Sequence, residues 1–300
     1  MLVKNIIAYS ACLCISSLSA EKSGAYVEGG FQYSNFSGTN ATIHTSYPTY
    51  TAYITKPNGH GQIVREAIRI LGSPGSATIT TYSGNLYGID VQVGYKQFFG
   101  RKKHFGLRYY GIFSGQGGNS SAIVGSIINQ PSANLFYGVG IDTLFNFYEK
   151  HNRTFGIFAG IMIGGSSWLM GKSTAPDDCQ WTTTNSDGAS TCATMNQFYA
   201  QEAKSINNHT NSPTNPSGET ATFSPTFVQL IFNVGLRTNF TKHQGFEFGV
   251  RIPTIDDPYF TIKRNTIGVN PNWLTGGKNS KETIVFRRNV SLYWNYVFNF

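Results

Sequence analysis

The stretch SLYWNYVFNF, residues 291–300, decides the fold. Every second position in it carries a large apolar side chain, and most of the positions between them are polar. The apolar positions are Leu292, Trp294, Tyr296, Phe298 and Phe300. Because successive side chains of a β-strand point to opposite faces, this alternation predicts a strand with one apolar and one mainly polar face.

Seven earlier segments show the same alternation over about ten residues each, which is typical of strands that cross a membrane as a barrel. They are residues 25–35, 86–99, 104–114, 134–148, 153–168, 225–240 and 244–252. Short turns alternate with long polar connections at 36–85, 115–133, 169–224 and 253–283. We therefore predict an all-β fold, a transmembrane antiparallel up-and-down β-barrel of about eight strands with long extracellular loops.

A soluble β-sandwich also has alternating strands, but the face that it exposes to water is charged. Here only 13% of the residues are charged, and the polar faces are rich in Gly, Asn and Gln. This composition favours a narrow polar lumen. The net charge of +8 does not indicate nucleic-acid binding, because the basic residues concentrate in short turns rather than in a stripe.

The first twenty residues resemble a secretory signal peptide. Lys4 precedes an apolar stretch at 6–15, and small residues follow up to a predicted cleavage site after Ala20. A lipoprotein site at Cys12 is the alternative. We therefore divide the chain into a signal peptide, 1–20, and an outer-membrane barrel, 21–300. No later segment reaches 18 consecutive apolar residues, the minimum for a transmembrane helix.

Cys179 and Cys192 remain after cleavage, in a polar segment. Two cysteines in an exported protein most often form a disulfide, which we predict here. A metal site would need further ligands at suitable spacing, and the sequence offers none, so we expect no metal and no cofactor.

Eight charged residues fall on the polar faces of the predicted strands and should point into the lumen. They are Glu28, Asp90, Asp142 and Glu247 with Lys96, Arg108, Arg237 and Arg251. Side chains just fill the interior of an eight-stranded barrel, and buried charges persist when they are paired. A salt-bridged plug is therefore favoured over an ion pathway.

Two features of the long loops are open to more than one interpretation. Residues 62–71 have apolar residues at helical spacing, which predicts a short helix over the barrel mouth or, as the alternative, a partner-binding helix. The acid pairs at 177–178 and 256–257, with His209, could activate water at the rim. Because Asp is common in turns, we do not expect an enzyme.

Several segments resemble the Helicobacter outer-membrane protein family of the Hop and Hor type. They are FYGVGIDTLFNFYE (136–149), TFGIFAGIMIGGSSW (154–168), FVQLIFNVGLRTNF (227–240), GFEFGVRIPTI (245–255), RRNVSLYWNYVFNF (287–300) and EKSGAYVEGGFQYS (21–34). The resemblance implies an outer-membrane location and a C-terminal barrel. Some members are adhesins with a large extracellular domain after the first strand, and others are porins. This chain has only about fifty residues at that place.

The final strand, ending in Phe300, is similar to the signal that the barrel-assembly machinery reads. Our hypothesis is an outer-membrane barrel that presents surface loops, with a structural or adhesin-like role. A small porin is the alternative, and a rim enzyme resembling an outer-membrane protease is the third. The partners expected are outer-membrane lipid, the assembly machinery and a host receptor or glycan, with no nucleic acid. The expected location is the cell outer membrane, with loops at the surface.

Overall fold

The computed structural model describes residues 22–59, 62–100, 103–124, 126–150, 152–175, 178–185, 187–210, 218–264 and 277–300. The predicted signal peptide and its cleavage site at Ala20 lie outside these residues.

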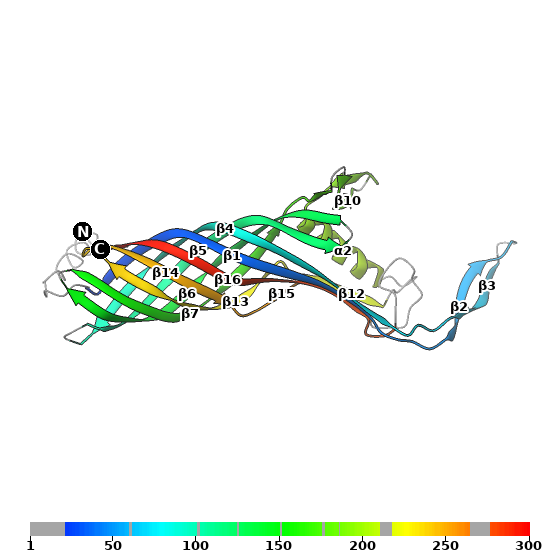
Figure 1. The fold of residues 1–300 in the computed structure, drawn as a ribbon. Helices are drawn as coiled ribbons and strands as arrows, with labels where there is room; N and C mark the ends of the chain where they lie inside the picture. Colours follow the sequence, from blue (N-terminus) through cyan, green and yellow to red (C-terminus); the bar gives the residue numbers. More distant parts are fainter. Residues whose placement is uncertain are drawn as a thin grey trace, which may run out of the picture.

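Eight long strands form a closed antiparallel ring (Figure 1). In order around the ring they are β1 (Gly24–His44), β4 (Ser76–Phe99), β5 (Phe105–Val124), β6 (Ser126–Lys150), β7 (Arg153–Met170), β13 (Thr226–Asn239), β14 (Gln244–Pro253) and β16 (Lys281–Asn299). Pairing of β16 with β1 closes the ring. The predicted eight-stranded up-and-down barrel is confirmed.

The apolar and polar positions that alternate in the sequence lie on the outer and the inner face of the barrel wall, respectively. Apolar side chains such as Val93, Ile141 and Val234 are exposed on the outside, and polar ones such as Gln92 and Asn233 are buried inside. An apolar outer face is stable only against lipid. Tyr296, Phe298 and Phe300 are exposed on this outer face with Trp294, and Leu292 shares their face.

One end of the barrel carries the short turns, and we call it the turn end. Lys103 and Asn152 adopt positive φ angles of 49° and 65° there, a conformation that allows the chain to reverse within a few residues. Outward aromatic rings surround this end, with centroids 6.1 Å apart for Phe99 and Phe105 and 5.0 Å apart for Phe147 and Phe155. β1 begins and β16 ends at the turn end (Figure 1).

A second outward aromatic pair, Tyr33 and Tyr87, has ring centroids 5.2 Å apart. Tyr87 and Phe99 lie about 30 Å apart along the barrel axis at the usual rise and tilt of such strands, close to the thickness of a bilayer core. Beyond the tyrosines the outer face becomes polar, with Asn85 and Ser83 exposed. The band between the two aromatic levels is therefore the membrane-spanning segment.

The opposite end, which we call the loop end, is more regular than the sequence suggested. The segment at 36–85 is a continuation of β1 and β4 with a hairpin between them, β2 (Tyr50–Pro57) and β3 (Ile63–Ile70). The helix predicted at 62–71 is wrong. Its β-branched residues, Ile63, Val64 and Ile68 among them, pair as a strand with β2, and this pairing overrides the helical spacing.

The three other long connections also contain regular structure. The segment at 115–133 consists almost entirely of the ends of β5 and β6, and 253–283 contains β15 (Asp257–Arg264). The segment at 169–224 contains β8 (Thr174–Ala175), β9 (Asp178–Cys179), β10 (Thr182–Thr184), β11 (Ser190–Cys192), α2 (Met195–Thr210) and β12 (Glu219–Phe223). The predicted loop ranges therefore included long strand ends.

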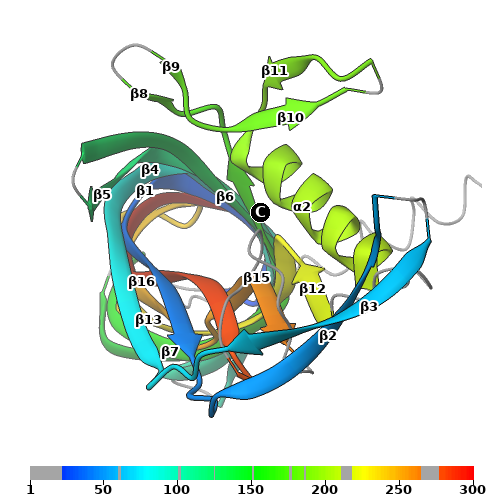
Figure 2. The same ribbon diagram turned by 90° about the vertical axis from the view of Figure 1, so that its right-hand side faces the viewer.

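At the loop end the ring of strands is broken, and α2 lies in the break (Figure 2). β15 replaces β14 beside β16, and β12 pairs with β15 as the edge strand. Asn196 of α2 donates to the carbonyl oxygen of Trp168 at 3.0 Å and accepts from the amide of Met170 at 3.1 Å, at the end of β7. Asn207 binds both backbone groups of Ala221 on β12 at 2.9 Å. Two amide side chains thus replace the missing backbone ladder on either side of the helix.

Candidate functional site

The lumen is the first candidate site, and Arg108 is at its centre. Its guanidinium lies 2.6 Å from the Asp142 carboxylate, 2.7 Å from that of Glu247 and 3.3 Å from that of Glu28. Arg108 and the three acids are all almost fully buried. One cation therefore holds together carboxylates from three strands, β1, β6 and β14, across the interior.

The other four predicted lumen residues lie around this centre. Arg251 forms an ion pair with Asp90, and Arg237 lies 3.7 Å from Glu247. Lys96 donates to the side chain of Asn299 at 3.1 Å. The structure thus places all eight predicted charged residues inside the barrel.

Aromatic rings fill the space that the charges leave. Tyr110, Phe158 and Tyr293 are buried on the inner face. Their rings lie where a Cβ atom on Gly140, Gly235 or Gly249, respectively, would stand, at 2.4–2.6 Å. Each glycine on the inner face of one strand therefore admits a ring from another strand. Rings and ion pairs together fill the cross-section of the barrel.

An apolar cluster closes the lumen at the loop end. Its members come from the strands and from α2, and they include Phe36, Trp168, Met195, Tyr259 and Phe286. The ring centroid of Trp168 is 5.4 Å from that of Phe36 and 5.7 Å from that of Phe286. This cluster lies over the charged network as a second, apolar layer.

Comparison with known proteins decides where such a barrel belongs. A sequence model of the Helicobacter outer membrane protein family matches residues 90–300. The chain belongs to this family. It is therefore an outer-membrane β-barrel protein.

No curated protein matches the sequence. Two solved structures align with this outer-membrane barrel over nearly its whole length. The outer membrane protein OprG from Pseudomonas aeruginosa is 10% identical with a TM-score of 0.40, and 93% of this chain and 97% of that one are covered. The outer membrane protease OmpT from Escherichia coli is 9% identical with a TM-score of 0.32, over 92% and 97% of the two chains.

Of the rim acids of this outer-membrane barrel, Asp256 and Asp257 lie on opposite faces of the wall. Asp256 is exposed and lies 3.4 Å from Arg287 on the outer face. Asp257 is fully buried on the inner face. His209 interacts through its Nδ1 with the Ser205 carbonyl oxygen on its own helix. Asp177 lies outside the described residues, as does the side chain of Asp178. Within the part of the chain that is described, no group of three potential metal ligands occurs.

Cys179 and Cys192 lie at disulfide-bonding distance, with Cα atoms 5.7 Å apart. Cys192 ends the small hairpin of β10 and β11, where it pairs with Thr182. The ring of Trp181 packs against Phe198 of α2 at 5.1 Å. The predicted disulfide would fasten the hairpin close to the helix that completes the wall.

Three buried charged residues were not predicted from the sequence: Arg288, Glu219 and Arg264. Arg288 is buried on the inner face of β16, although strict alternation from Ser291 would place it outside. A β-bulge in the pairing with β1 shifts the register between Val290 and Arg288 and reverses the faces. The buried ion pair of Glu219 and Arg264 was also missed, because both residues lay in segments interpreted as loops.

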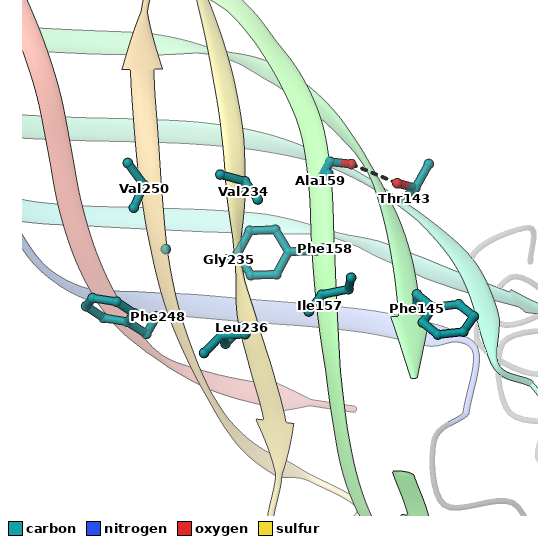
Figure 3. A pocket seen from close by; sticks show the side chains of 11 residues that line it. Thr143, Phe145, Ile157, Phe158, Ala159, Val234, Gly235, Leu236, Phe248 and Val250 are labelled. Atoms are coloured by element: carbon teal, nitrogen blue, oxygen red, sulfur yellow. Dashed lines mark hydrogen bonds between the residues drawn. The ribbon is translucent and has the colours of Figure 1, made fainter. Parts of the chain in front are cut away.

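The outer wall has an apolar depression in the membrane-spanning band (Figure 3). Residues of β6, β7, β13 and β14 line it, among them Phe145, Ile157, Leu236 and Phe248. It faces the lipid, and its lining offers no charged group. Among the described residues, no helix is long and apolar enough to cross a membrane.

Proposed function

We propose that this protein is a closed outer-membrane barrel that holds the β2–β3 hairpin at the cell surface as a contact arm for a partner molecule. In this proposal the loop end faces the exterior and the turn end the periplasm. The barrel is an anchor and not a channel, and it has no catalytic role.

The filled lumen carries this proposal. Arg108 with its three acids, the Arg251–Asp90 pair and the aromatic rings occupy the interior of an eight-stranded ring, and this filling supports a barrel without a continuous aqueous path. The apolar layer around Trp168 is a second barrier at the loop end. A purified monomer should therefore show no steady conductance in a planar bilayer.

The arm supports the role in partner contact. Within the described residues, β2 and β3 pair only with each other, and they project far beyond the rest of the barrel (Figure 1). An isolated two-stranded hairpin is marginally stable in water and has two free edges that can accept another strand. Ile63 and Tyr53 are strongly exposed, at 76% and 59%. The arm therefore presents the backbone edges and apolar side chains of a docking element.

The charge of the arm indicates the kind of partner. Arg65 lies over the ring of Tyr53, 4.5 Å from its centroid, and Arg69 is exposed beside it. Lys56 is paired with Glu66. The net positive charge favours an acidic polypeptide that adds a strand to the hairpin edge.

The test uses cells that display the full chain and a chain without the arm. Tyr47 and Ser73 form a β-bridge at the base of the arm, so residues 48–72 can be replaced by a short Gly-Ser turn without loss of the barrel. We expect capture of an acidic extended peptide by wild-type cells and none by the shortened chain. Arg65→Glu with Arg69→Glu keeps the hairpin and should also abolish capture.

Two results would contradict the proposal. Equal capture by the full and shortened chains would show that the arm is not needed for partner contact. Stable openings of large conductance in the planar bilayer would establish the porin alternative, because a lumen filled as described does not conduct.

A further inference from the structure

Four asparagines form a continuous row on the outer wall, just beyond the tyrosine level. Asn289, Asn35, Asn85 and Asn119 lie on the neighbouring strands β16, β1, β4 and β5. Asn35 is directly opposite Asn85, and Asn85 is directly opposite Asn119. We call these four residues the asparagine row.

Hydrogen bonds run along the row in one direction. Ser37 donates to Asn289 at 3.1 Å, and the Nδ2 of Asn289 donates to Asn35 at 2.8 Å. The Nδ2 of Asn35 then donates to the Oδ1 of Asn85 at 3.2 Å. The hydroxyl of Tyr33 donates to the same oxygen at 2.9 Å. These bonds hold the amides of Asn289, Asn35 and Asn85 in place, and Asn85 is directly opposite Asn119.

The row borders a shallow polar depression. Its lining includes Asn35, Asn85 and Asn119 with Ser83 and Ser121, and the ring of Tyr87 forms its membrane side. Tyr87 is directly opposite Gly117, which has no side chain to cover the wall there. The depression therefore combines fixed amide groups, hydroxyl groups and one exposed aromatic face.

The position and chemistry of the row indicate its ligand. It lies where the outer face changes from apolar to polar, at the level of lipid head groups. Amides both donate and accept, as sugar hydroxyl groups do. A phosphate group would call for arginine or lysine, but Arg288 of β16 is buried on the inner face. Arg287, the nearest exposed charged residue on that strand, is already paired with Asp256.

We propose that the asparagine row binds the saccharide head group of a membrane glycolipid, whose acyl chains lie on the apolar band below Tyr33 and Tyr87. The outer leaflet of an outer membrane carries such head groups. The inference shares with the proposed function only the outward orientation of the loop end, and it does not involve the arm.

The test compares two lipids that differ only in the head group. Digalactosyl diacylglycerol and phosphatidylcholine with identical acyl chains are titrated against the full-length barrel, and bound lipid is measured by native mass spectrometry. We expect wild-type protein to prefer the glycolipid by about tenfold, the effect of one or two hydrogen bonds. Asn85→Ala with Asn119→Ala should abolish the preference and leave phosphatidylcholine binding unchanged.

Gln97→Ala is the matched control. Gln97 is an exposed amide on the outer face of the same strand, β4, but at the turn end, so its loss should leave the preference intact. Equal binding of the two lipids to wild-type protein would overturn the inference. A preference that survives in the double variant would also overturn it. The asparagine row would then serve only to join neighbouring strands. Equally tight binding of free digalactose would mean that the ligand is a soluble saccharide and not a membrane lipid.

Discussion

The two halves of the lumen are filled in different ways. In the half toward the turn end, charged side chains from opposite walls meet at Arg108, and aromatic rings occupy the positions above glycines. In the half toward the loop end, an apolar cluster around Trp168 takes over, and α2 contributes to it. The wall differs in the same way, because the ring of strands is continuous in the first half and interrupted in the second.

This difference shows what a closed ring makes possible. Where backbone ladders complete the wall, every backbone group is satisfied and the interior can hold a polar network fixed by ion pairs. Where the ladder is interrupted, the chain inserts a helix, and the helix needs an apolar surface to stay in place. The first half should therefore be sensitive to the loss of single charges, and the second to the loss of packing and of the contacts that seal the helix.

The largest effect is expected from Arg108→Met. The substitution leaves Glu28, Asp142 and Glu247 buried without their common cation, which should destabilise the barrel by about 5 kcal/mol. The urea midpoint for the loss of the heat-modifiable folded form measures this. Lys242→Met in an exposed turn is the control. If both variants unfold at the same midpoint, the network is hydrated and the lumen is not closed.

The next largest effect should come from removing both amides that seal the helix. Asn196→Ala with Asn207→Ala leaves backbone groups of β7 and β12 without partners, at a cost of about 3 kcal/mol. Hydrogen exchange should accelerate in α2 and β12 and stay unchanged around Arg108. Asn208→Ala, an exposed neighbour, should change neither. Faster exchange throughout the barrel would mean that the two halves unfold as one unit.

Asp257 should make the loop-end half sensitive to pH. It lies beyond the membrane-spanning band, and burial raises the pKa of its carboxyl from 3.8 to about 7. The unfolded chain loses this proton at lower pH than the folded one, so stability falls as pH rises between these values. Asp257→Asn should remove this fall, which we expect to be about 2–3 kcal/mol between pH 5 and pH 8. Exchange rates of β15 near pH 5 and pH 8 measure it, with Asp256→Asn as the exposed control. An equal pH dependence in wild type and Asp257→Asn would contradict the assignment.

The smallest effect on the barrel should come from the disulfide. Cys179→Ser with Cys192→Ser releases a loop whose closure is worth on the order of 3 kcal/mol to the hairpin alone. We expect faster proteolysis within residues 180–191 and a change of less than about 0.5 kcal/mol in barrel stability. Two free thiols in alkylated, unreduced wild-type protein would show that the bond does not form.

The same contrast explains how far the sequence could predict the structure. In the first half, period-two alternation is interrupted in β6 between Asn146 and Tyr148, beyond Asp142, so the strands and all eight inward charges still follow from the pattern. In the second half, one extra residue in β16 reverses the alternation and hides Arg288. No local sequence pattern predicts such a bulge, because the bulge depends on the register between β16 and β1.

The sequence predictions for α2 and for the arm were wrong for different reasons. α2 carries buried residues at Met195, Tyr199, Ala203 and Ile206, a helical spacing that was present in the sequence and was missed within a segment interpreted as a loop. Residues 63–70 also have helical spacing, but they form a strand because β2 offers a partner of matching length. The spacing of apolar residues alone does not distinguish these two cases, because the segment that each one packs against decides whether it forms a helix or a strand.

The seam between β1 and β16 has a consequence for how the protein is made. It joins residues from opposite ends of the chain, and the side chains of Ser34 and Ser291 meet across it although they are 257 positions apart. Until β16 has been delivered, β1 and β14 both keep an open edge in the membrane, and Arg251 has no Tyr293 ring to cover it. Closure of the ring therefore depends on β16, the last of the strands along the chain. A chain cut short before β16 would expose two strand edges, and such edges are templates for pairing with other chains.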